Sequence, residues 1–342
     1  MPRRGHGVAE AGTLTDCLGY GNIAIIRAHR LSLLFRLVYH QANMSVRMTR
    51  LRILGLALSA GLALSSLAAC RRKEAPAPPV ATPTVTLNHD RAPLGSPLEV
   101  TYKFVVANDA RFSEDYRVMS HIVDADGQMM WDDDHNPPVP TSQWKPGQTV
   151  EYTRTVFVRV YPYVGDAAIQ VGLYSVANQK RLPLAGEDSG QRAYKVAKLQ
   201  LQPQTENIFT VFKDGWHPAE APEHNGGVEW QWTKRDATLS FKNPKKDVVF
   251  YFDVDSPDSV AHDPQQVQVS LNDQPVAELA LKPKDRVLKK IPLTAAQLGT
   301  GEMAELRVSV DKTFVPALVP GANSKDPREL GVRVFHAFVD GR

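Results

Sequence analysis

Cysteine is almost absent from this sequence of 342 residues, in which Cys17 and Cys70 are the only two. Two isolated cysteines exclude a disulfide-rich scaffold and a zinc site built from several cysteines. An excess of one charge sign is also lacking, because 40 Lys and Arg residues oppose 37 Asp and Glu residues. The formal net charge of +3 therefore gives no reason to expect a nucleic-acid partner. A hydrophobic content of 43% is typical of globular domains and too high for a disordered chain.

The motifs of the common enzyme classes are missing as well. The sequence contains no H-E-x-x-H, no G-x-S-x-G, no phosphate-binding Walker loop and no dinucleotide-binding fingerprint. We therefore expect a protein that is not an enzyme and that holds no cofactor and no metal.

The longest apolar run is Ile53–Ala69, whose 17 residues fall just short of the roughly 18 needed to span a bilayer. Arg47, Arg50 and Arg52 precede it, and small residues end it, which is the pattern of a secretory signal peptide. Its end, Leu67-Ala68-Ala69-Cys70, resembles the lipobox of bacterial lipoproteins. An uncleaved membrane anchor is the alternative.

The resemblance to bacterial lipoproteins implies that Cys70 is acylated, becomes the mature N-terminus and holds the protein on membrane lipid. Arg71 follows where Asp would favour the inner membrane, so the outer membrane is favoured, on its periplasmic or outer surface. We expect residues 44–69 to be the signal peptide, starting at Met44 or Met48, and residues 1–43 to precede the true start. Residues 70–83, rich in Pro and Ala, form the expected lipidated tether.

Residues 1–69 hold eight arginines and only two acidic residues. The chain from Cys70 onward then has 32 basic and 35 acidic side chains, a formal charge of −3. The basic character of the whole sequence therefore comes from the targeting segment.

Alternation of apolar and polar residues predicts an all-β protein with two tandem sandwiches. Within residues 84–204 the expected strands suit an immunoglobulin-like sandwich, and they are 84–88, 98–106, 116–123, 128–131, 149–158, 168–174 and 193–201. Asp126-Gly127 is expected to form a two-residue hairpin turn in which both residues have positive φ. Residues 202–214 are expected to be a connection without a strand.

A second sandwich is predicted over residues 215–340. Its strands suit a jelly-roll-like arrangement, and they are 228–233, 237–241, 248–254, 266–271, 276–281, 286–292, 304–310 and 332–339. Asn272-Asp273 occupies the position of a hairpin turn, and Thr294–Leu298 is the one expected helical turn.

Five short motifs of the second sandwich carry a resemblance, and they are Gly215-Trp216, Glu229–Thr233, Val269–Asp273, Thr313–Pro316 and Asp326–Val332. In this order they resemble β-sandwich modules of bacterial cell-surface glycan proteins, including extensions of some glycosyltransferases. The resemblance implies an association with envelope polysaccharide. It does not imply transferase chemistry, because no nucleotide-sugar domain is present.

Candidate ligand-binding residues lie in these motifs. Trp230 and Trp232 stand two apart on one expected strand, so their rings share a face and either stack on sugars or fill the core. Trp216 and His217 lie in a loop and are expected to be exposed. Asp326 and Arg328 form either a structural salt link, which we favour, or contacts to sugar hydroxyls.

The acidic segment Asp132-Asp133-Asp134-His135 is the most conspicuous candidate for chemistry. Carboxylates and an imidazole together suit either a metal or general base catalysis. The segment lacks the spacing of a calcium loop and precedes two prolines, so we favour a solvated surface loop. A hydrolase using Asp132, Asp134 and His135 is the remote alternative.

The sequence therefore favours a non-catalytic envelope lipoprotein that binds cell-surface glycan or supports its assembly. The alternative is a structural lipoprotein whose sandwiches bind an envelope protein.

Overall fold

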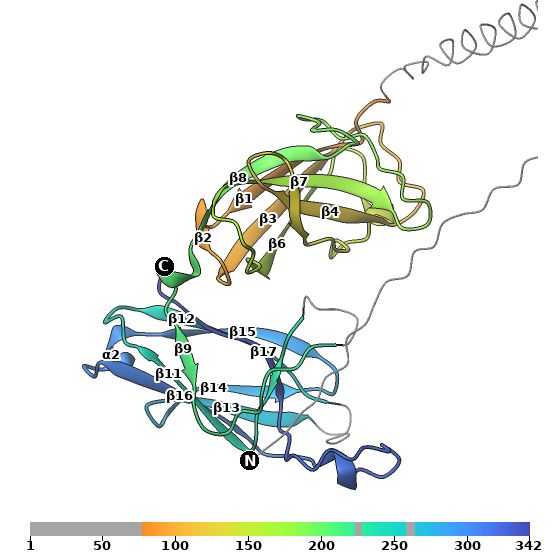
Figure 1. The fold of residues 1–342 in the computed structure, drawn as a ribbon. Helices are drawn as coiled ribbons and strands as arrows, with labels where there is room; N and C mark the ends of the chain where they lie inside the picture. The colour runs from red at the N-terminus through yellow and green to blue at the C-terminus, as the bar shows by residue number, and fades with distance from the viewer. Residues whose placement is uncertain (1–76, 223–227, 258–263) are drawn as a thin grey trace, which may run out of the picture. The chain divides into compact units, whose positions relative to one another are not determined.

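A computed structural model describes residues 77–222, 228–257 and 264–342 (Figure 1). In these ranges almost all regular structure is β, with seventeen strands in four sheets, which confirms the predicted all-β class. Cys70, the predicted signal peptide and the residues before it lie outside the described residues. No helix within the described ranges is long and apolar enough to cross a membrane.

The strands between residues 81 and 202 form the first sandwich. Its members are β1 (Ala81–Leu87), β2 (Arg91–Pro93), β3 (Pro97–Val106), β4 (Tyr116–Val123), β5 (Met129–Asp132), β6 (Thr149–Phe157), β7 (Gly165–Ser175) and β8 (Tyr194–Gln202). One sheet has the order β1-β3-β6 and the other the order β2-β8-β7-β4-β5. All neighbouring strands are antiparallel except β2 and β8. Short 3₁₀ turns occupy Thr141–Gln143 and Gln204–Glu206.

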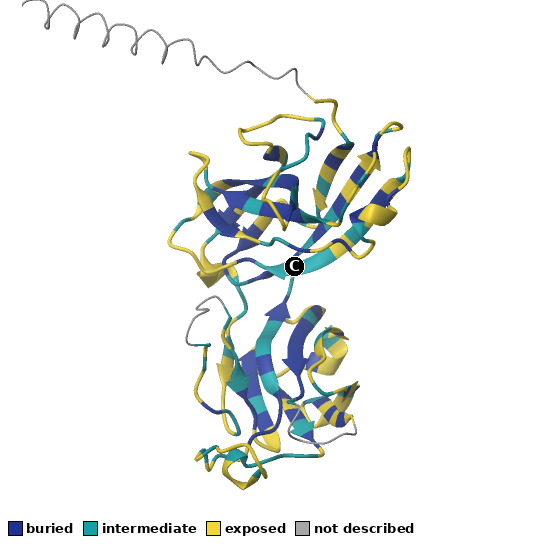
Figure 2. Cartoon of the chain, turned by 90° about the vertical axis from the view of Figure 1, so that its right-hand side faces the viewer, coloured by how far each residue is buried: buried dark blue, intermediate teal, exposed yellow. Residues whose placement is uncertain are grey.

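Period-two alternation explains how the two sheets share a core. Along β3 every second side chain is buried, namely Leu98, Val100, Tyr102, Phe104 and Val106. Figure 2 shows the same alternation of buried and exposed residues along several strands. Because successive side chains of a strand point to opposite faces, this pattern fixes which face of each sheet is buried.

The strands between residues 210 and 340 form the second sandwich. They are β9 (Thr210–Phe212), β10 (Gln231–Trp232), β11 (Asp236–Lys242), β12 (Val248–Asp255), β13 (Gln265–Leu271), β14 (Gln274–Leu281), β15 (Arg286–Leu293), β16 (Met303–Val310) and β17 (Arg333–Asp340). The sheets have the orders β10-β17-β12-β15 and β14-β13-β16-β11-β9, and every pairing is antiparallel. The side chains between them form one apolar core.

The turns of the second sandwich follow their local sequence. Asn272 and Asp273 both have positive φ, 47° and 65°, and join β13 to β14 as predicted. The expected helical turn is α2 (Ala295–Leu298), where the Thr294 hydroxyl accepts from the Gln297 amide and the Gln297 side chain accepts from the Thr294 amide. This capping box satisfies two amides that the helix leaves free. A further 3₁₀ turn spans Pro316–Leu318.

Four details differ from the sequence prediction. The first strand begins at Ala81, so the last three residues of the expected tether belong to β1. Strands β2 and β9 were not predicted, and β9 lies in the expected connection. Strand β10 covers only two of the six residues expected. Gly127 has positive φ but Asp126 does not, because the β4–β5 connection is longer than a two-residue turn.

Candidate functional site

Trp230, just before β10, and Trp232, within it, lie around an arginine of the neighbouring strand β17. Trp232 is the register partner of Arg333 on β17. The Arg333 guanidinium carbon is 5.5 Å from the ring centre of Trp230, and 5.7 Å from those of Trp232 and Phe335. These distances suit cation–π attraction. The prediction that both indoles share a face is therefore confirmed, and they share it with a cation.

A buried carboxylate fixes the position of Arg333. Asp255 on β12 is only 4% exposed and accepts from Arg333 Nε at 2.8 Å and from Nη2 at 2.5 Å. A two-bond pair of this kind holds the guanidinium plane as well as its charge. Arg333 is thus positioned by strand register on one side and by Asp255 on the other.

Asp326 and Arg328 form the salt link favoured by the sequence. Arg328 Nη2 donates to Asp326 Oδ2 at 2.7 Å, and its Nη1 donates to Glu220 Oε1 at 2.6 Å. Hydrogen bonds from Arg328 hold the pKa of Asp326 at about 2, so this carboxylate is ionised at neutral pH. The other oxygen of Glu220 accepts from Trp232 Nε1 at 3.3 Å. One polar chain therefore connects the 326–328 loop to the indole of β10.

These residues surround a cleft on the second sandwich with a volume of about 440 Å³. Its lining combines aromatic rings with charged groups, among them Trp232, Phe314, Arg333, Glu220, Asp326 and Arg328. Phe314 packs edge-on against Trp232, with ring centres 5.7 Å apart. The volume lies within the usual range of small-ligand sites, roughly 300–1,000 Å³. Apolar rings beside fixed hydrogen-bonding groups suit a ligand with both kinds of surface.

The expectation that Trp216 and His217 are exposed is wrong for His217. His217 is 9% exposed, its amide donates to the Trp232 carbonyl at 2.9 Å, and its Nε2 lies 2.7 Å from the Glu329 carbonyl. Trp216 is half-buried and donates from Nε1 to the Thr238 carbonyl at 2.7 Å. Both residues hold the chain around residue 216 against the sheet and do not line the cleft.

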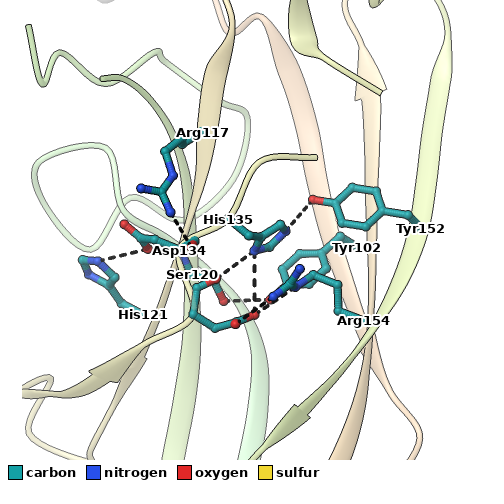
Figure 3. Close-up of polar contacts among 9 residues, drawn as sticks. Tyr102, Arg117, Ser120, His121, Asp134, His135, Tyr152 and Arg154 are labelled. Atoms are coloured by element: carbon teal, nitrogen blue, oxygen red, sulfur yellow. Dashed lines mark hydrogen bonds and ion pairs between the residues drawn. The ribbon is translucent and has the colours of Figure 1, made fainter. Parts of the chain in front are cut away.

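The acidic segment of the first sandwich is not a solvated loop, which corrects the favoured interpretation. His135 is 5% exposed, and Asp133 accepts from Arg154 at 3.0 and 3.2 Å. Asp134 points the other way, accepting from the Ser120 amide at 2.9 Å and lying 3.6 Å from His121 Nε2 (Figure 3).

The remote hydrolase hypothesis required Asp132, Asp134 and His135 to meet in one cleft. The structure does not bring them together, because Asp132 lies 4.0 Å from Arg159 whereas Asp134 faces His121. The segment instead joins the two sheets of the first sandwich. No group of three residues able to hold a metal occurs among the described residues.

The hydrogen bonds of His135 determine which ring nitrogen carries the proton in the neutral imidazole. Its Nδ1 lies 2.8 Å from the Asp133 carbonyl, which can only accept, so Nδ1 carries the proton. Its Nε2 lies 2.8 Å from the Tyr152 hydroxyl, which therefore donates. Burial raises the pKa of Tyr152 and of the neighbouring Tyr102, so both phenols stay protonated. Burial also lowers the pKa of His135 below its ordinary value of 6.5.

This arrangement predicts acid sensitivity of the first sandwich. The folded state favours the neutral imidazole of His135 over the protonated one. The stabilisation by neutral His135 is therefore complete above about pH 6.5 and decreases as the pH falls below that value. We expect the melting temperature to fall between pH 7.5 and pH 5.5, and to fall less in His135→Gln. The melting temperatures are measured by circular dichroism. If they fall equally with pH in both proteins, His135 does not contribute to the acid sensitivity.

Comparison with known proteins identifies no family. No protein-family profile matches the sequence, and no curated protein matches it either. Solved structures with a similar arrangement include a Bacteroides uniformis beta-glucuronidase 2, at 10% identity and a TM-score of 0.24 over 78% of this chain. The tandem CBM22 domains of Paenibacillus barcinonensis Xyn10C match at 9% identity and a TM-score of 0.22 over 77% of this chain.

The share of each matched protein that this chain covers differs. The match extends over 30% of the glucuronidase chain and 92% of the Xyn10C tandem domain. A third solved structure is the M60 catalytic domain with two CBM51 domains from Clostridium perfringens ZmpB. It matches 72% of this chain and 34% of its own chain, at 8% identity and a TM-score of 0.22. These neighbours are carbohydrate-active and carbohydrate-binding proteins with β-sandwich domains.

Proposed function

We propose that this protein is a non-catalytic envelope lipoprotein whose second sandwich binds cell-surface glycan in the cleft beside β10. The observation that carries the proposal is the lining of that cleft, which brings Trp232, Asp326 and Arg328 together with Phe314 and Arg333. The partly exposed Phe314 ring can stack on the apolar face of a sugar while the buried Trp232 packs against it, and ionised side chains bind sugar hydroxyls. The resemblance of the Thr313–Pro316 and Asp326–Val332 motifs to glycan-associated modules supports the same assignment.

The cleft is largely formed before a ligand arrives. Arg328 is held by both Asp326 and Glu220, and Arg333 is held by Asp255. Groups fixed in this way lose little conformational freedom on binding, which favours affinity for a weakly interacting ligand such as a sugar. Phe314 and Arg328 are only partly buried, so both can contact a ligand.

A retention experiment tests glycan binding. Full-length protein is passed over immobilised polysaccharide purified from the host envelope, and we expect Phe314→Ala and Arg328→Gln each to weaken binding about tenfold or more. Leu318→Ala and Lys325→Gln are the matched controls, because they remove an apolar and a cationic side chain from the same loop without altering the cleft lining. Recovery of a protein partner with no retained polysaccharide would contradict the proposal.

The lipid anchor has its own test. Cys70→Ser is expected to abolish labelling with a palmitate analogue and to leave uncleaved precursor in the cell, because the serine hydroxyl cannot replace the acylated thiol. Cys17→Ser, which removes the other cysteine, is expected to keep normal labelling. Persistent labelling of Cys70→Ser would contradict the assignment.

A further inference from the structure

A second pocket lies on the first sandwich, apart from the residues that line the cleft. It has a volume of about 600 Å³ and is formed by β4, β7, the segment between β7 and β8, and Asp134 of the segment after β5. Its charged and ring-bearing lining residues are His121, Asp134, Tyr174, Lys180, Arg181 and Arg192. The structure describes every residue of the first sandwich, including all residues around this pocket.

The pocket is basic in a chain whose formal charge from Cys70 onward is negative. Three cations, Lys180, Arg181 and Arg192, face a single carboxylate, Asp134. Among the described residues, no carboxylate forms an ion pair with any of these three cations. Asp134 itself is engaged with the Ser120 amide and His121. The pocket therefore holds an uncompensated positive charge.

The backbone positions two of these cations. Arg181 Nη1 donates to the Gln191 carbonyl at 3.1 Å, and an Arg192 guanidinium nitrogen donates to the Arg181 carbonyl. Gly172 permits this arrangement, because a Cβ there would lie only 3.0 Å from the Arg192 carbonyl oxygen. The two arginines are thus held at one wall of the pocket, with most of their donors free.

Three residues of the lining have a left-handed backbone conformation, which is unfavourable for residues other than glycine. The φ angles are 60° at Gln179, 55° at Gln191 and 58° at Arg192. All three residues are exposed, and Gln191 and Arg192 form a tight turn that places Arg192 beside Arg181.

We propose that this pocket binds a saccharide that carries a carboxylate group. A guanidinium pairs with a planar carboxylate through two parallel hydrogen bonds, and two arginines are available for it. Tyr174, Gln179 and Gln191 provide neutral groups for sugar hydroxyls. The volume of about 600 Å³ lies within the usual range of small-ligand sites. This site goes beyond the proposed cleft, since it lies in the other sandwich and uses different residues.

Calorimetric titration of the full chain tests the site with two disaccharides that differ in charge. Digalacturonate is expected to bind, and neutral galactobiose to bind at least about tenfold more weakly, since it cannot form charge-assisted hydrogen bonds with the arginines. Arg181→Gln and Arg192→Gln are each expected to weaken digalacturonate binding by about tenfold. Lys180→Gln, which changes an exposed side chain, provides the same test if an arginine variant fails to fold.

Two further variants distinguish binding in this pocket from general surface attraction and from binding in the cleft. Lys198→Gln removes an exposed cation of the same sandwich outside the pocket and should leave the affinity within about twofold, since distant surface charges contribute little. Phe314→Ala, in the cleft of the second sandwich, should not change digalacturonate binding. Equal affinity for both disaccharides, tighter binding of galactose 1-phosphate, an equal loss in Lys198→Gln, or no binding at all would overturn the proposal.

Discussion

Arg333→Leu is expected to destabilise the second sandwich by about 3–5 kcal/mol, the usual cost of leaving one member of a buried ion pair without its partner. Asp255 is 4% exposed and receives two hydrogen bonds from Arg333. The substitution removes both bonds and leaves the carboxylate desolvated. Urea unfolding, followed by tryptophan fluorescence, measures the loss as a lower midpoint.

Two further variants isolate the cause of this loss. Arg307→Leu breaks an exposed ion pair with Asp273, in which the carboxylate side chain is 76% exposed, and should cost no more than about 1 kcal/mol. Arg333→Leu combined with Asp255→Leu should recover part of the lost stability, because it removes the unpaired charge. A double variant as unstable as the sum of its two single variants would contradict this account.

Gly215→Ala is the second substitution expected to have a large effect. A Cβ at this position would lie 1.9 Å from the Asp236 carbonyl oxygen and 2.7 Å from the Ala237 Cα, so backbone atoms of β11 would have to move. Gly215 also has a φ of +82°, which is unfavourable for alanine. We expect a loss of stability of about 3 kcal/mol or more.

Gly321 supplies the matched control for Gly215. It has the same φ of +82°, but nothing lies within 4 Å of a Cβ built there. Gly321→Ala should therefore cost only the backbone strain, about 1 kcal/mol. If thermal unfolding shows equal losses for the two variants, the close approach of Gly215 to β11 is not what requires glycine.

The strands were predictable because their core faces repeat every second residue. Tyr116–Val123 is both predicted and observed, and β16 buries every second residue from Ala304 to Val310. Strands β2 and β9 have three residues each, too few to establish alternation. Their pairing depends on the longer strands beside them, which a local pattern does not contain.

The site was predictable only in part, for a related reason. The spacing of Trp230 and Trp232 and the charges of Asp326 and Arg328 are local, and the structure shows the expected shared face and salt link. Glu220 and Arg333 were missed because their partners are distant in sequence. Arg328 lies 108 residues from Glu220, and Arg333 lies 78 residues from Asp255.

The first sandwich shows the same limit. Asp133 and His135 were assigned to a solvated loop because an acidic run before prolines is usually exposed. Their burial depends on Arg154 and Tyr152, which β6 places beside them. The basic pocket gave no sequence signal, because Lys180 and Arg181 are separated from Arg192 by a loop that brings them together only in the fold.

Glycan binding in the cleft of the second sandwich can be followed at a single indole by nuclear magnetic resonance. The indole N–H of Trp232 donates to Glu220 in the cleft, whereas that of Trp144 donates to the Val139 carbonyl in the first sandwich. On adding oligosaccharides from the host envelope to the full chain, we predict a saturable shift of the Trp232 indole signal and none for Trp144. An unchanged Trp232 signal at saturating oligosaccharide would show that the cleft does not bind glycan.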